Sequence, residues 1–198
     1  MEKGFEDLKR RISVTTSNRF NASERLKRHN QFSLFTVIAF SLGLILVSIT
    51  ITLNIDVAVN RVVLSASSIF FSVVILTIST ALSMSNFGLR GEKHHDCGRE
   101  LHALLLDIEK SVLNNDLQSP DSYSNYQAKY EQILARYENH TKVDHLFTKF
   151  ARSEDYPKKW YRGPIAYGRL WLEYSIYAIL LIVEIVWLVI IYTPFSHA

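Results

Sequence analysis

The sequence has little cysteine and little glycine, and both shortages narrow the class of protein. Among 198 residues there is 1 cysteine, Cys97, which excludes a disulfide framework within one chain. The 7 glycines form neither a phosphate-cradling loop nor a nucleophile elbow. No group of residues combines a nucleophile, a base and an orienting side chain, so neither an enzyme nor a bound cofactor is expected.

Charged residues are absent from two long apolar stretches, which predicts that the chain spans a membrane. Phe32 to Leu53 has 22 residues and Val62 to Met84 has 23, all of them uncharged. As a helix, the first would be about 33 Å long, enough to cross a hydrocarbon core of about 30 Å. The short connection from Asn54 to Arg61 is typical of an antiparallel helical hairpin.

A third apolar stretch, Tyr174 to Tyr192, contains an acid, Glu184, near its middle. Insertion scales place an acid at a helix centre at about +2.5 to +3.5 kcal/mol, which the neighbouring Ile, Leu and Val residues offset. Glu173 and Tyr177 lie on nearly the same helical face as Glu184. Intramembrane acids often mark functional sites. Glu184 and Glu173 could line a polar pathway, or Glu184 could be a neutral acid packed against a partner helix.

The distribution of Lys and Arg predicts the orientation. Basic residues precede the first span, follow the second and precede the third, whereas none follows Tyr192. The positive-inside rule therefore places the N-terminus in the cytoplasm and the C-terminus outside. The predicted parts are a cytoplasmic basic helix (1–31), a transmembrane hairpin (32–84, with spans 32–53 and 62–84), a cytoplasmic helical domain (85–169), a third transmembrane helix (170–192) and an extracytoplasmic tail (193–198).

The segments next to the first two spans have helical patterns. Phe5 to Gln31 has apolar residues at helical spacing and is expected to run directly into the first span. Glu92 to Asn114 is expected to be a helix after the second span. Its apolar stripe is predicted to contain His95, Leu101, Leu104, Leu105, Ile108 and Leu113.

Two more helices are expected before the third span. Ser119 is predicted to cap a tyrosine-rich helix that begins at the following proline and ends near Asn139, a residue type that accepts the left-handed conformation. A short helix is expected from Val143 to Phe150. The predicted fold class is therefore an all-α membrane protein with a cytoplasmic helical bundle.

Hydroxyl and small residues form stripes on the first two spans. Five serines of the second span fall within about 60° on a helical wheel: Ser65, Ser68, Ser72, Ser79 and Ser83. Small residues let transmembrane helices pack closely, so helix packing is one interpretation, and pore lining beside the Glu184 face is the other. In the first span Thr36, Gly43 and Thr50 recur at heptad spacing, which favours close packing.

The histidines and aromatic residues do not form a familiar binding motif. His94, His95, Cys97 and His102 are metal-ligand types, but they lack the repeated short spacing of a zinc site, so no metal is expected. The aromatic residues lie at helical spacing and the basic residues lie beside the spans, so direct nucleic-acid binding is not expected either. Membrane lipid is the expected contact of the basic residues.

Three segments together resemble a known family. They are Asn18 to Arg28, Glu92 to His102 and Tyr137 to Asp144. In combination they resemble the SLATT family, the membrane-spanning effector modules of bacterial conflict systems. The resemblance covers roughly residues 19 to 150, and the third span is an addition to the family's two-span pattern. It gives these residues as family-motif or gating candidates: Arg19, Arg25, His95, Glu100, Asn139, His140 and Asp144. From the residues alone, His140 and Asp144 could hold the turn after the tyrosine-rich helix or bind an activating ligand, and the structural role is favoured.

The resemblance implies an inner-membrane effector of bacteria that permeabilises the membrane in antiviral defence or abortive infection. Its implied partner is a sensor encoded nearby, either a nucleotide-signal enzyme, a nucleotide-binding module or a reverse transcriptase. A homo-oligomer is expected, because three helices of one subunit cannot enclose a water-filled channel. Two alternatives remain open, a membrane-anchored signalling scaffold and a small proton-coupled transporter that uses Glu184.

Overall fold

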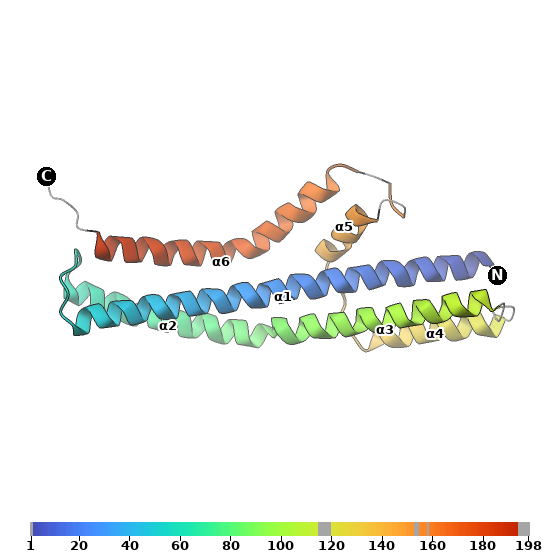
Figure 1. Ribbon diagram of the computed structural model, residues 1–198, viewed down its shortest axis with the longest axis horizontal. Helices are drawn as coiled ribbons and strands as arrows, with labels where there is room; N and C mark the ends of the chain where they lie inside the picture. Colours follow the sequence, from blue (N-terminus) through green and yellow to red (C-terminus); the bar gives the residue numbers. More distant parts are fainter. Residues whose placement is uncertain (1, 115–119, 153–154, 158, 194–198) are drawn as a thin grey trace. The chain divides into compact units, whose positions relative to one another are not determined.

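The computed structural model describes residues 2–114, 120–152, 155–157 and 159–193, and these residues form helices and no strand (Figure 1). The helices are α1 (Glu2–Thr52), α2 (Arg61–Ser85), α3 (Phe87–Leu113), α4 (Pro120–Ala135), α5 (Lys142–Ala151) and α6 (Arg162–Tyr192). Three helical stretches are long and apolar enough to cross a membrane. The predicted class, an all-α membrane protein, is confirmed. The predicted cap at Ser119 and most of the predicted tail lie outside the described residues.

The chain divides into two compact units. Residues Met1–Lys27 and Gly88–Leu170 form one, called the bundle unit, and Arg28–Phe87 and Trp171–Ala198 form the other, called the membrane unit. Both α1 and α6 contribute residues to each unit. The polar sequence segments gather in the bundle unit, and the three apolar stretches gather in the membrane unit.

Helix α1 continues without a break from the basic N-terminal segment into the first apolar stretch, as predicted. Its buried positions recur at alternating steps of three and four residues, the spacing of a helix that packs along a nearly parallel partner. In the bundle unit they are Phe5, Leu8, Ile12, Thr16, Arg19, Ala22 and Leu26. In the membrane unit they are His29, Ser33, Thr36, Phe40, Gly43, Val47 and Thr50. This regular spacing is why one helix can serve both units.

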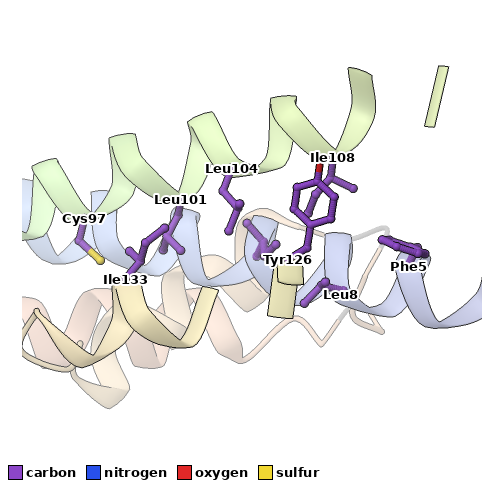
Figure 2. Packing of buried hydrophobic residues seen from close by; sticks show 9 residues of the cluster. Phe5, Leu8, Cys97, Leu101, Leu104, Ile108, Tyr126 and Ile133 are labelled. Atoms are coloured by element: carbon purple, nitrogen blue, oxygen red, sulfur yellow. The ribbon is translucent and has the colours of Figure 1, made fainter. Parts of the chain in front are cut away.

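The core of the bundle unit joins α1, α3 and α4 (Figure 2). Phe5, Leu8 and Ile12 come from α1, Cys97, Leu101, Leu104 and Ile108 from α3, and Tyr126 and Ile133 from α4. Gly98 allows α3 to approach α1 closely, because a Cβ at this position would lie 2.8 Å from the ring of Phe20. Burial of such apolar side chains supplies most of the driving force for this unit, about 1.5 to 3 kcal/mol for each one.

Helix α3 differs from its prediction in its start and in its buried face. It begins at Phe87 rather than Glu92, because Asn86 adopts a left-handed backbone (φ 48°) that ends α2 and lets the next helix start at once. His94 is buried in place of the predicted His95, and Leu113, also predicted to be on the stripe, is 82% exposed. The buried face follows the spacing set by α1, and His95 lies about 100° around the helix from His94.

Two helix ends also differ from prediction. The tyrosine-rich α4 ends at Ala135, well before Asn139, and the non-glycine residues with positive φ in the described part are Asn54 and Asn86. Helix α6 begins at Arg162, ahead of the predicted start at residue 170. Pro164 lies in the first turn of α6, where backbone N–H groups have no intrahelical acceptor, so this proline does not interrupt the helix. The short helix α5 matches its prediction closely.

The membrane unit contains the C-terminal half of α1, all of α2 and most of α6. An apolar cluster joins the three helices through Val47, Leu64 and Ile191. The ring of Phe71 on α2 lies 4.6 Å from the ring of Trp187 on α6. The hairpin loop is tied by Arg61, which donates hydrogen bonds to the side chain and carbonyl oxygens of Asn54. Leu64 is the buried residue that α2 contributes within the described part of the chain.

Candidate functional site

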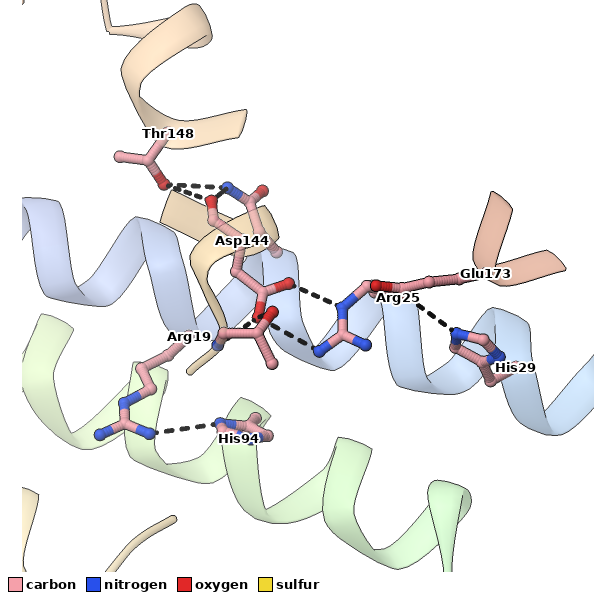
Figure 3. Close-up of polar contacts among 9 residues, drawn as sticks. Arg19, Arg25, His29, His94, Asp144, Thr148 and Glu173 are labelled. Carbon is pink, nitrogen blue, oxygen red and sulfur yellow. Dashed lines mark hydrogen bonds and ion pairs between the residues drawn. The ribbon is translucent and has the colours of Figure 1, made fainter. Parts of the chain in front are cut away.

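In the bundle unit, Asp144 is the centre of a buried polar cluster (Figure 3). Its side chain is 1% exposed. It accepts a hydrogen bond from Nε of Arg25 at 2.9 Å and another from Nη2 of Arg25 at 3.3 Å. The same carboxylate accepts hydrogen bonds from the backbone N–H of Thr141 at 2.9 Å and from the Thr141 hydroxyl at 2.8 Å. Asp144 therefore both caps the start of α5 and pairs with a cation on α1. Four charge-assisted hydrogen bonds of this kind offset the cost of burying a carboxylate.

Asn21 adds a second connection between α1 and α5. Its side-chain amide donates to the hydroxyl of Thr148 at 2.9 Å and to the carbonyl oxygen of Asp144 at 3.3 Å. Thr148 is itself buried and donates to the same carbonyl. Because every one of these groups is buried or half-buried, the position of α5 on α1 is fixed by hydrogen bonds as well as by packing.

Arg19 is buried at the meeting point of α1, α3 and the segment between α4 and α5. It is 1% exposed, and its guanidinium donates to the carbonyl oxygen of Glu138, to Asn139 Oδ1 at 3.5 Å and to His94 Nδ1 at 3.4 Å. Among the described residues, none of the Arg19 nitrogens meets a carboxylate. The Arg19 Nε and His140 Nδ1 atoms are buried there without a hydrogen-bond partner in the described part.

Burial favours the neutral form of three histidines in the bundle unit. Burial lowers the pKa of His94, and the positive charge of Arg19 lowers it further. Burial, followed by Arg19, likewise lowers the pKa of His140, and burial followed by Lys149 lowers the pKa of His145. Asn18 joins two of them, since its amide contacts His140 Nε2 at 3.1 Å and His145 Nδ1 at 3.3 Å. Neutral imidazoles can each accept one hydrogen bond and donate another.

Of the seven family-motif candidates, five meet in this cluster and two lie elsewhere. Arg19, Arg25, Asn139, His140 and Asp144 are brought together. His95 instead contacts the ring of Phe20, at a centroid distance of 5.4 Å. Glu100 accepts a hydrogen bond from the Tyr137 hydroxyl at 2.7 Å and another from Arg136 Nη2 at 2.5 Å. The hydrogen bond to Glu100 raises the pKa of Tyr137 to about 12. His95 therefore packs α3 against α1, whereas Glu100 ties α3 to the residues that follow α4.

In the membrane unit, a polar group of residues surrounds His29, at the start of the apolar part of α1 (Figure 3). The His29 ring contacts Glu173 Oε2 at 3.2 Å through Nε2 and the Tyr177 hydroxyl at 3.2 Å through Nδ1. The ring of Phe87 stacks on His29 at 5.1 Å, and that of Tyr174 meets its edge at 4.6 Å. Glu173 and Tyr177, predicted to share a face of the third span, therefore share a partner on α1.

Glu184 lies deeper along the same contact between α1 and α6. It is 4% exposed, whereas Val183 and Ile185 beside it are 45% and 58% exposed. Its carboxylate lies against Gly43 so closely that a Cβ added to Gly43 would overlap Oε1. No hydrogen-bond or ion-pair partner for this carboxylate occurs among the described residues. In this structure Glu184 is therefore packed against α1 of the same chain.

The heptad residues of the first span have the packing position that their spacing favoured. Thr36, Gly43 and Thr50 are all buried on α1. The Thr50 hydroxyl lies 2.5 Å from the Tyr192 hydroxyl, so a polar contact ties α1 to α6 at the far end from His29. We call the α1 and α6 residues between these two ties the polar seam: His29, Ser33, Thr36, Gly43 and Thr50 on α1, and Glu173, Tyr177, Glu184 and Tyr192 on α6.

The serine stripe of α2 does not take part in such ties. Ser72 and Ser83 are exposed, and Ser65, Ser68 and Ser79 are half-buried. The hydroxyls of Ser68, Ser72 and Ser79 donate to carbonyl oxygens one turn back on α2 itself. The stripe is therefore available for contact with lipid, with water or with another copy of the chain.

Sequence reasoning missed Asn18, Asn21, His29 and His94 as members of these clusters. The signal that could have found His29 is the spacing of α1, because a polar residue at a buried step of three or four must meet a partner across the contact. His29 lies at such a step between Leu26 and Ser33. Its partners come from a helix more than 140 residues later, which a local pattern cannot identify.

The comparisons agree with the resemblance. The model of SMODS and SLOG-associating 2TM effector domain family 5 matches residues 1–194. The match is wider than the predicted 19 to 150 and includes α6, so the third apolar helix lies within the family region rather than beyond it. Comparisons with curated proteins and with solved structures give no match. The chain therefore belongs to SMODS and SLOG-associating 2TM effector domain family 5, a SLATT family of membrane effectors associated with conflict systems.

Proposed function

We propose that this chain assembles into an oligomer that permeabilises the bacterial inner membrane in antiviral defence or abortive infection, under the control of a partner sensor. Family membership supports an effector that acts at a membrane and is associated with SMODS and SLOG proteins. The partner is then a nucleotide-signal enzyme, a nucleotide-binding module or a reverse transcriptase encoded nearby. The positive-inside bias supports a cytoplasmic N-terminus and an extracytoplasmic C-terminus.

The observation that carries the proposal is the hydroxyl face of α2, where Ser72 and Ser83 are exposed and Ser65, Ser68 and Ser79 are half-buried. Lipid tails gain nothing from serine hydroxyls, yet five serines share one face of a span that contributes Leu64 as its buried residue in the described chain. In a ring of copies, that face can line a wet lumen while the opposite face of α2 stays in lipid. One subunit offers three spans, too few to enclose water alone, so the proposal requires several copies.

The test is to express the protein and follow membrane potential with a dye, in cells and in vesicles that hold the purified full chain. Wild type at high level should depolarise the membrane. Ser72→Leu/Ser79→Leu, which makes the stripe apolar, should conduct less. Thr77→Leu, which removes an exposed hydroxyl away from the stripe, should conduct as wild type does. An intact potential at confirmed membrane expression, with and without the neighbouring genes, would favour a membrane-anchored scaffold instead.

A proton-coupled transporter is the second candidate, and the burial of Glu184 inside the subunit favours it. A carrier must shield its titrating acid from lipid, as Glu184 is shielded against Gly43. Transport would saturate with substrate and require a pH gradient, whereas conduction through a pore would do neither. Glu184→Gln should abolish transport if the carboxyl carries protons, while a pore should keep conducting.

A further inference from the structure

The membrane unit has two kinds of helix contact, apolar and polar, and they differ in whether entering water would find hydrogen-bonding groups. Contacts of α2 with its neighbours are made by apolar rings and side chains, such as Phe71 against Trp187 and against Phe40. The contact of α1 with α6 is the polar seam. Water that enters an apolar contact finds no hydrogen-bonding group, whereas water that enters the seam can hydrate a carboxylate, an imidazole and several hydroxyls.

The seam has a polar tie near each of its two ends. His29 fixes one end through Glu173 and Tyr177, and the Thr50 contact with Tyr192 fixes the other. Midway between them Glu184 is seated on Gly43, where the missing side chain of glycine makes the space for the carboxylate. Single interhelical hydrogen bonds in membranes contribute little each, so the seam is the contact that a modest force can separate.

We propose that α1 and α6 separate along the polar seam when the effector opens, and that the seat of Glu184 on Gly43 is the latch of the closed form. This inference rests on the proposed permeabilising function and names its control. In the closed form Glu184, Thr36 and Thr50 are sealed inside each subunit. In the open form they face the shared lumen beside the serines of α2, where the Glu184 charge is hydrated and attracts cations.

The first test enlarges Gly43. Gly43→Ala puts a methyl group where Oε1 of Glu184 lies, so it should unseat the latch and raise the untriggered ion leak by about tenfold or more. Gly43→Ala/Glu184→Ala restores the space and should return the leak towards that of wild type. Gly168→Ala is the matched control, since a Cβ at this glycine of α6 meets no atom within 4 Å. Potassium efflux from vesicles of phosphatidylethanolamine and phosphatidylglycerol is the measurement.

The second test asks whether water enters the seam. In a Cys97→Ala background, Thr36→Cys should be unreactive towards a charged thiosulfonate reagent in the closed protein, because Thr36 is 2% exposed. Adding Gly43→Ala should make it reactive. Ile38→Cys, at a 56% exposed position that faces lipid, should stay unreactive in both forms. A thiolate forms in water but not in hydrocarbon. Comparing Thr36→Cys with Ile38→Cys therefore distinguishes entry of water into the seam from a general loosening of the helices.

The outcomes separate this inference from the function on which it rests. If Gly43→Ala leaks while Thr36→Cys stays as unreactive as Ile38→Cys, the pathway lies elsewhere and the latch is wrong, although permeabilisation stands. A Gly43→Ala leak that Glu184→Ala fails to lower also overturns the latch. If no form of the protein conducts, the proposed function fails first. Should Gly43→Ala not accumulate, His29→Ala opens the seam from its end and must give the same reactivity at Thr36→Cys.

Discussion

The bundle unit and the membrane unit bury acids in opposite ways. Asp144 in the bundle unit accepts four hydrogen bonds, two of them from the cation Arg25. Glu184 in the membrane unit lies against a glycine. In the bundle unit, the hydrophobic effect assembles the helices and a fully paired acid adds precision. Between helices in lipid that effect is missing, so close packing and scattered polar contacts must hold the unit together.

Removing Asp144 should produce the largest loss of stability in the bundle unit. Asp144→Ala leaves Arg25 buried without its carboxylate and removes the cap of α5, so we expect a loss of about 3 to 5 kcal/mol. Urea unfolding of the detergent-solubilised protein, followed by circular dichroism, measures it. The control is Asp96→Ala, which breaks an exposed pair with Arg99 at 3.7 Å and should cost little. Equal losses in the two variants would mean that the buried pair contributes no more than a surface pair.

Replacing a leucine by alanine should lower the free energy of unfolding strongly in the bundle unit and very little in the membrane unit. Leu101 is 0% exposed in the bundle core, so Leu101→Ala should cost about 2 to 5 kcal/mol. Leu172 in the membrane unit is 75% exposed, and Leu172→Ala should change the stability of the solubilised protein very little. Unfolding midpoints of the two variants decide the matter. A large loss at Leu172 would show that this position is covered by another copy of the chain.

The pattern of the sequence predicts the helices better than it predicts which side chains contact one another. Long apolar stretches identify the membrane helices because their length and lack of charge are local properties, and α1 and α5 could be placed in the same way. The seat of Glu184 on Gly43 could not, since it depends on the rotation of two helices about 140 residues apart. The choice of His94 over His95 likewise depends on how α3 turns towards α1, which one helix alone does not determine.

Acid should weaken the bundle unit through its neutral histidines. The pKa values of His94, His140 and His145 are lower in the folded state than the ordinary value. Below about pH 6.5 the unfolded chain therefore binds more protons than the folded chain does. Stability should therefore be complete above that pH and fall as the pH drops towards 5. Unfolding midpoints at a series of pH values measure the effect. His94→Gln removes one of these three groups and should flatten the profile.

The smallest effect should come from a single hydroxyl at the end of the polar seam. Tyr192→Phe removes the contact with Thr50, and we expect a loss of about 0.6 kcal/mol, the mean for one interhelical hydrogen bond in a membrane. Tyr130→Phe removes a comparable contact with Thr15 at 2.9 Å in the bundle unit, with an expected loss of about 0.5 to 1.5 kcal/mol. Double-mutant cycles with Thr50→Val and Thr15→Val isolate the two energies. A much larger coupling at Tyr192 would mean that the seam is rigid.

The capping of α5 by Asp144 has a consequence for when this helix exists at all. With 10 residues, α5 is shorter than the length at which an isolated helix is stable in water, because nucleation is costly. The carboxylate that nucleates its first turn is the same group that pairs with Arg25, so coiling and docking are one cooperative event. A partner that draws Arg25 away would take two of the four hydrogen bonds from Asp144, so the first turn of α5 and its attachment to α1 would loosen together.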